Sequence, residues 1–195
     1  MEVHNNKTNK IPNYEHQNVL LIATPFSPLD RASLGLHILK SLSHDNNINI
    51  LYLNINLASK ISEDHYNQIL GNSPLSFFMG ERIFARAAHD IPALGNDNGQ
   101  NIIYELNRIK SSMVKAGLDP NRMKLNLEWL MDVEEVVFQW IDEITDQIIK
   151  IKPTIVGCTS MFEQNNASIA ILKYIKNKNN DITTCMGGAN CEGEM

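Results

Sequence analysis

The sequence predicts an α/β fold of the doubly wound type, with about four parallel strands layered against helices. Two short apolar runs, residues 18–24 and 48–54, are separated by a segment whose apolar residues have helical spacing. The same order of strand, helix and strand recurs between residues 154 and 186. Strands joined through a helix pair in parallel with a right-handed crossover, so both units fit one sheet.

The first strand and its helix open the predicted domain. Residues 18–24, NVLLIAT, form a continuous apolar run, which is typical of a strand buried on both faces. Two prolines within residues 25–28 exclude a helix there. A helix capped by Asp30 or Ser33 is then expected up to about residue 43. Its apolar positions are Leu34, Ile38, Leu39 and Leu42.

A helical insertion is expected over residues 59–125, between the second and third strands. Residues 56–120 carry no strand pattern. Helical spacing predicts helices over residues 58–70, 77–89 and 102–116, the last ended by Gly117. We expect the insertion to lie over one end of the sheet.

Residues 131–152 contain the clearest helical pattern, and Pro153 ends it. This helix leads directly into a strand at residues 154–158, so it is the expected crossover helix. Its apolar stripe recurs every three or four residues. The stripe consists of Val133, Val136, Val137, Trp140, Ile141, Ile144, Ile148 and Ile151.

The closing unit repeats the pattern. A helix capped by Asn165 or Asn166 is expected to run to about residue 177, and a fourth strand covers residues 182–186. Cys158 and Cys185 end apolar strands, where small buried thiols are typical. Cys191 lies in a polar turn and is the only cysteine expected to be reactive.

Composition excludes several functional classes. The net charge of −5 and the lack of a basic cluster argue against nucleic-acid binding. No apolar run approaches the roughly 18 residues needed to span a membrane, and the polar start does not form a signal peptide. We therefore expect a cytoplasmic protein with a disordered lead-in at residues 1–17. The six histidines lack metal-ligand spacing, so no protein metal site is expected.

Three turns qualify as ligand sites because each follows a strand: residues 24–35, 159–165 and 187–194. In an open parallel sheet, ligands bind beyond the carboxyl ends of the strands. Backbone without Cβ atoms at Gly187 and Gly188 can approach a large ligand closely. The sequence contains no G-x-G-x-x-G, no P-loop and no G-x-S-x-G, which disfavours dinucleotide, triphosphate and serine-hydrolase sites.

Residues 153–190 resemble the later half of a cobalamin-binding domain, which typically reads P-D-[VI]-V-G, a Ser/Thr pair, a helix and D-I-x-x-x-x-G-G. More narrowly, the chain resembles the N-terminal region of radical SAM proteins that mature ribosomally made peptides. The shared motifs are PFSPLDRASLG at residues 25–35 and GGANCEGEM at residues 187–195. The similarity covers about residues 18–58 and 131–195.

The resemblance implies a Rossmann-like or flavodoxin-like cobalamin-binding domain of an enzyme that C-methylates a precursor peptide. The corrinoid carries the methyl group, and an iron–sulfur cluster cleaves S-adenosylmethionine to the radical. By resemblance, three turns cradle the corrinoid. Their residues are Thr24, Pro25, Phe26, Leu29, Arg31, Ser33, Gly35, Thr159, Ser160, Met161, Asn165, Gly187, Gly188, Ala189 and Asn190.

The chain departs from the family pattern in three ways. It has no CxxxCxxC triplet, so S-adenosylmethionine and the [4Fe-4S] cluster are expected only in a downstream domain or a separate radical SAM polypeptide. The fifth strand of such domains is missing, which suggests a truncated or split enzyme. Mutase-type domains carry D-x-H-x-x-G, and Ala32 stands where that histidine would be.

Two other interpretations remain open. A non-catalytic, degenerate cobalamin- or partner-binding module fits the same fold. A flavodoxin-like domain that binds another nucleotide cofactor also fits it. A CxxxCxxC motif encoded in the downstream DNA would support the enzyme, and its absence would support the non-catalytic module. A yellow rather than a red purified protein would support the flavodoxin-like domain.

Overall fold

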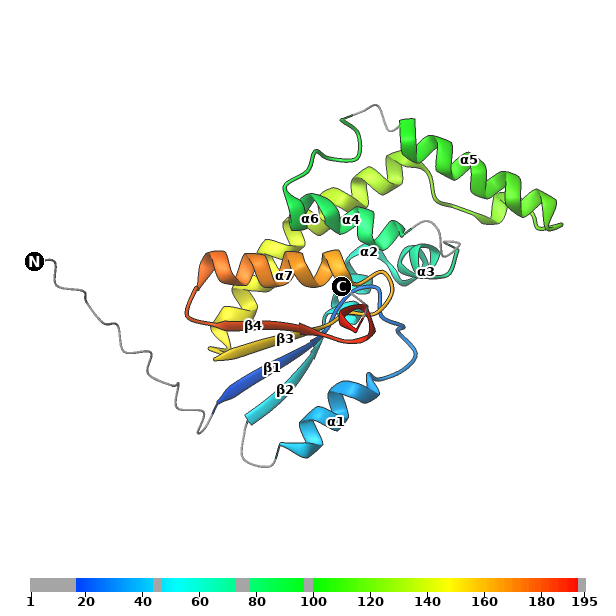
Figure 1. Ribbon diagram of the computed structural model, residues 1–195. Coiled ribbons are helices and arrows are strands. Elements are labelled where there is room, and N and C mark those ends of the chain that lie inside the picture. Colours follow the sequence, from blue (N-terminus) through cyan, green and yellow to red (C-terminus); the bar gives the residue numbers. More distant parts are fainter. Residues whose placement is uncertain (1–16, 44–46, 73–77, 97–99, 193–195) are drawn as a thin grey trace, which may run out of the picture.

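A computed structural model describes residues 17–43, 47–72, 78–96 and 100–192. Residues 1–16 of the lead-in and the last three residues of the GGANCEGEM motif lie outside these ranges. Four parallel strands form one sheet in the order β2-β1-β3-β4 (Figure 1), which confirms the predicted parallel α/β fold. The strands are β1 (Asn18–Ala23), β2 (Asn47–Tyr52), β3 (Ile155–Thr159) and β4 (Thr183–Gly187).

Helices flank the sheet on both sides. Because β2 and β3 lie on opposite sides of β1, right-handed crossovers place their connecting helices on opposite faces. Helix α1 lies on one side of the sheet, and α6 and α7 lie on the other (Figure 1). The helices are α1 (Leu34–Leu42), α2 (Leu53–Ile61), α3 (Glu63–Asn72), α4 (Met79–His89), α5 (Gln100–Lys115), α6 (Leu127–Lys150) and α7 (Asn165–Lys178), with short 3₁₀ turns η1 (Pro120–Arg122) and η2 (Ala189–Cys191).

The two faces of the sheet differ in burial. Leu20 and Ile22 of β1 are buried in the core that includes α6 and α7. Val19 and Leu21, which alternate with them, remain partly exposed on the α1 side. The prediction that residues 18–24 are buried on both faces is therefore wrong for one face. The reason is that α1 contacts mainly β2 and buries only Leu36.

Helix α6 is the predicted crossover, and it begins four residues earlier than expected. The side chain of Asn126 caps it by accepting a hydrogen bond from the Trp129 backbone N–H (2.9 Å). Val136 and Ile151 of the predicted apolar stripe are exposed, so the stripe faces the core only in part. The residues that face the core are Val133, Val137, Trp140, Ile141, Ile144 and Ile148.

The insertion is helical, as predicted, but its first helix is divided. Ser62 adopts φ 73° and separates α2 from α3, where the sequence suggested one helix. Helices α2 and α3 follow the carboxyl end of β2, whereas α4 packs on α7 and α6. Helix α5 extends away from this body (Figure 1). Gly117 adopts φ 71° just beyond α5, in keeping with its predicted role as the helix stop.

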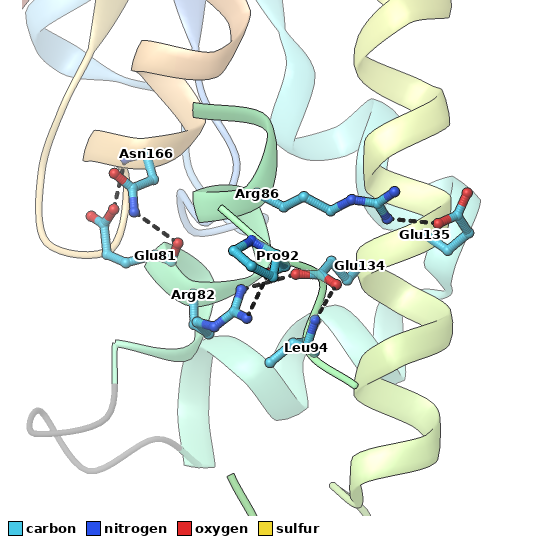
Figure 2. Close-up of polar contacts among 8 residues, drawn as sticks. All are labelled: Glu81, Arg82, Arg86, Pro92, Leu94, Glu134, Glu135 and Asn166. Carbon is cyan, nitrogen blue, oxygen red and sulfur yellow. Dashed lines mark hydrogen bonds and ion pairs between the residues drawn. The ribbon is translucent and has the colours of Figure 1, made fainter. Parts of the chain in front are cut away.

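Helices α4 and α7 cap each other through two carboxylates. Glu81 accepts hydrogen bonds from the backbone N–H groups of Asn165 (2.8 Å) and Asn166 (2.6 Å), as Figure 2 shows in part. Glu163 in turn accepts one from the Gly80 N–H (2.6 Å). The N-cap residue Gln164 makes no side-chain cap bond. The prediction that Asn165 or Asn166 caps α7 is therefore wrong, because a carboxylate from the insertion satisfies those donors.

Candidate functional site

The three predicted turns meet at the carboxyl edge of the sheet. The Thr24 hydroxyl donates to the Thr159 carbonyl (2.8 Å), and the Ser160 N–H donates to the Gly187 carbonyl (2.7 Å). The Gln164 amide donates to the hydroxyl of Ser27 (2.9 Å). These bonds tie the loops after β1, β3 and β4 into one surface, as parallel pairing led us to expect.

A cavity of about 980 Å³ opens beside this surface, between α1 and the less covered face of the sheet. This volume lies at the upper end of the usual range for ligand and cofactor pockets. Leu21 and Gly157 contribute to one wall, and the apolar stripe of α1 contributes to the other. Leu34 and Leu39 of that stripe are 74% and 54% exposed. The stripe therefore lines an open cavity and does not pack on the sheet.

Eight of the fifteen residues singled out from the sequence line the cavity, and seven do not. The lining residues are Phe26, Arg31, Ser33, Gly35, Thr159, Met161, Gly187 and Gly188. The other seven lie in the supporting turns; they are Thr24, Pro25, Leu29, Ser160, Asn165, Ala189 and Asn190.

Several polar groups expected to meet a ligand are used within the turns. Ser160 is buried, and its hydroxyl is bonded to Asn165 Oδ1 and Asn190 Nδ2 (3.0 Å). The Phe26 ring packs in the core against Tyr66, with ring centroids 5.1 Å apart. These groups shape the site through their protein partners and do not offer a ligand a free polar contact.

Gly188 sets the close approach of two turns. It adopts φ 119°, and a Cβ atom there would lie 2.5 Å from the Ser160 carbonyl oxygen. Only glycine meets both conditions without strain. At the neighbouring Gly187, a Cβ atom would meet nothing within 4 Å, so that backbone faces open space. The glycine pair thus combines a tight contact with a free surface toward the cavity.

Asn54 is a lining residue that the sequence reasoning missed. It is 1% exposed, and its amide donates to the Pro28 carbonyl (3.0 Å). Its side-chain oxygen has no hydrogen-bond partner among the described residues. A buried acceptor without a partner costs free energy that a donor can recover. Its place at the end of the apolar run of residues 48–54 was the one signal in the sequence.

Phe162 is a second missed residue. It lines the cavity and is 70% exposed, and its backbone lies in the left-handed region at φ 43°. A left-handed backbone at a bulky residue is not encoded by a local sequence pattern. The residue lies inside the predicted ligand-site turn at residues 159–165, but it was not among the residues singled out there.

The site carries little charge and no thiolate. Arg31 and Glu163 are the charged lining residues, and Arg31 is paired with Asp30 at 3.0 Å. Burial raises the pKa of the Cys158 thiol far above its usual range and raises that of Cys185 as well. Cys185 is exposed on its edge strand, so the expectation of a buried thiol is wrong there. Within the described ranges, no three His, Cys, Asp or Glu residues are placed to hold a metal ion.

Comparison with known proteins finds no match: no family model, curated protein or solved structure matches this chain significantly. None of the helices in the described part of the chain has the length and apolar character needed to cross a membrane.

Proposed function

We propose that this chain is the cobalamin-binding portion of a radical SAM enzyme that C-methylates a ribosomally synthesised precursor peptide. The observation that carries the proposal is the large apolar cavity at the carboxyl edge of a parallel sheet. Parallel α/β sheets bind large cofactors at this edge. The two motifs that resemble this enzyme class, residues 25–35 and 187–195, begin in turns that meet there.

The residues present fit a corrinoid. A corrinoid is large and mainly apolar in its ring, and it carries primary amides at its rim. The cavity supplies volume and apolar walls, and the open backbone at Gly187 admits a close approach. Asn54 also lines the cavity, and its side-chain oxygen, which has no partner among the described residues, is buried behind the cavity wall.

In this proposal the chain binds and orients the cofactor and excludes water from it. Leu21 and the α1 stripe contact its apolar parts, and the turns that contain Thr159 and Gly187 hold its edge. When bound, the corrinoid supplies a cobalt centre that carries a methyl group. No histidine lines the cavity in the described ranges, and Ala32 occupies the position of the mutase histidine. The protein therefore offers cobalt no imidazole from this loop.

The remaining components are assigned to other polypeptide segments. S-adenosylmethionine and the [4Fe-4S] cluster belong to a downstream domain or to a separate radical SAM polypeptide, which also acts on the precursor peptide. We place the protein in the cytoplasm, where its three free cysteines stay reduced. A non-catalytic binding module is the second candidate, favoured by the lack of a CxxxCxxC triplet in this chain.

A titration with hydroxocobalamin tests the proposal. The folded protein is expected to change the visible spectrum of the ligand and to retain it through gel filtration. The variant Leu39→Glu places a charge on the cavity wall and is expected to abolish binding. Leu42→Glu is the matched control, because Leu42 is also an exposed leucine of α1 but does not line the cavity.

Equal behaviour of the two variants contradicts the assignment of the cavity. Failure of the folded wild-type protein to bind hydroxocobalamin contradicts the proposed cofactor. A yellow purified protein that binds a flavin supports the flavodoxin-like alternative. Sequencing the downstream DNA for CxxxCxxC separates the enzyme from the non-catalytic module.

A further inference from the structure

Phe162 combines three properties that do not stabilise the fold. The residue is 70% exposed, and among the described residues it belongs neither to the aromatic pairs nor to the buried hydrophobic core. Its backbone has φ 43°, a conformation that costs free energy for any residue with a Cβ atom. It also lines the 980 Å³ cavity, next to the exposed Met161.

The surrounding structure holds this strained conformation in place. The Phe162 carbonyl accepts hydrogen bonds from the Asn190 side chain (2.8 Å) and from the Gln164 N–H (2.9 Å). The Gln164 side chain accepts from the Met161 N–H (2.9 Å) and donates to Ser27 (2.9 Å). The loops after β1, β3 and β4 together fix one residue. Strain that persists under such constraint is characteristic of functional positions.

We propose that Phe162 is a ligand-contacting residue that packs on the bound corrinoid and closes the cavity against water, with Met161 beside it. The inference rests on the proposed function and names the contact that the cavity is built to make. A flat conjugated ring offers the surface on which an exposed aromatic side chain stacks favourably. The free energy stored in the backbone is then offset by ligand contact and not by the fold.

Phe78 provides a matched comparison within the same chain. It also has φ 43° and is 51% exposed, and it precedes α4 as its N-cap residue. It does not line the cavity. Substitution by glycine relieves the same backbone strain at both positions, but it removes a cavity-lining ring only at Phe162.

The experiment compares Phe162→Gly with Phe78→Gly by thermal unfolding and by hydroxocobalamin titration. Without ligand, both variants are expected to melt higher than the wild type by roughly 2–4 °C, because glycine accepts positive φ freely. With ligand, Phe162→Gly is expected to bind about tenfold or more weakly, whereas Phe78→Gly binds as the wild type does. Phe162→Trp, which keeps an aromatic ring, is expected to retain binding.

A variant that melts higher but binds the ligand more weakly has lost a ligand contact, whereas loss of a structural role would lower the melting temperature. A Phe162→Gly protein that binds hydroxocobalamin like the wild type overturns this inference and leaves the proposed function intact. A Phe162→Gly protein that melts lower than the wild type without ligand shows a structural role and also overturns it. Failure of the wild-type protein itself to bind overturns both.

Discussion

Arg82 Nη1 of α4 lies 2.9 Å from Glu134 Oε1 of α6, and the glutamate side chain is only 3% exposed. The second carboxylate oxygen of Glu134 accepts a hydrogen bond from the Leu94 N–H (2.7 Å), and Arg82 also donates to the Pro92 carbonyl (3.4 Å). Figure 2 shows how these bonds join the insertion to the crossover helix. This pair, of which only the glutamate is fully buried, ties α4 to α6, and Glu81 of α4 caps α7.

Removal of the buried partner is expected to destabilise the protein strongly. Glu134→Ala leaves Arg82 partly buried without its carboxylate and the Leu94 N–H without an acceptor. We expect a loss of about 3 kcal/mol in the free energy of unfolding, measured by urea denaturation. The neighbouring Glu135 is the control, because its side chain is 52% exposed in its pair with Arg86. Glu135→Ala is expected to cost below about 1 kcal/mol, and equal losses would contradict the assignment.

The glycine pair is expected to respond asymmetrically to substitution by alanine. Gly188→Ala introduces a Cβ atom 2.5 Å from the Ser160 carbonyl at φ 119°. We expect it to lower the free energy of unfolding by about 2–3 kcal/mol, since both the contact and the backbone oppose it. Gly187→Ala meets open space and is expected to change stability by less than about 0.5 kcal/mol. A larger effect at Gly187 than at Gly188 in chemical denaturation would contradict this geometry.

The stability of the protein is expected to depend on pH through the carboxyl group of Glu135. The hydrogen bonds from Arg86 and Gln139 lower the pKa of Glu135 below its ordinary value. Its contribution to stability is present above the ordinary glutamate pKa of about 4.3 and is lost as the pH falls through the lower folded pKa. Titration of the Glu135 carboxyl by NMR measures that pKa directly. It is expected to rise toward the ordinary value in Arg86→Met, and an unchanged pKa would show that the ion pair does not cause the shift.

The three cysteines are expected to differ in alkylation rate. Cys158 is buried, and burial raises the pKa of its thiol, so little thiolate forms at pH 8. Cys185 is exposed but has a raised pKa for the same reason, whereas Cys191 is exposed in the η2 turn. Iodoacetamide is therefore expected to modify Cys191 first, Cys185 more slowly and Cys158 only after unfolding. Peptide mass spectrometry gives the order, and early modification of Cys158 would contradict its burial.

Local sequence patterns were enough to predict the layered α/β architecture and the three turns that meet at one edge. Short apolar runs separated by helical spacing are local patterns, and parallel pairing follows from the helices that connect them. The glycine pair and the Thr159–Ser160 turn were therefore identified correctly as neighbours across the sheet edge.

Which side chains face the cavity depends on how the layers pack, and no sequence pattern predicted it. Apolar spacing shows that α1 has an apolar stripe, but not whether the stripe meets the sheet or an open space. Groups distant in the sequence determine three features of the site and its support. These are the Asn54 oxygen, which has no partner among the described residues, the left-handed backbone of Phe162 and the burial of Glu134. Burial and hydrogen-bond satisfaction are properties of the assembled layers, so no local pattern fixes them in advance.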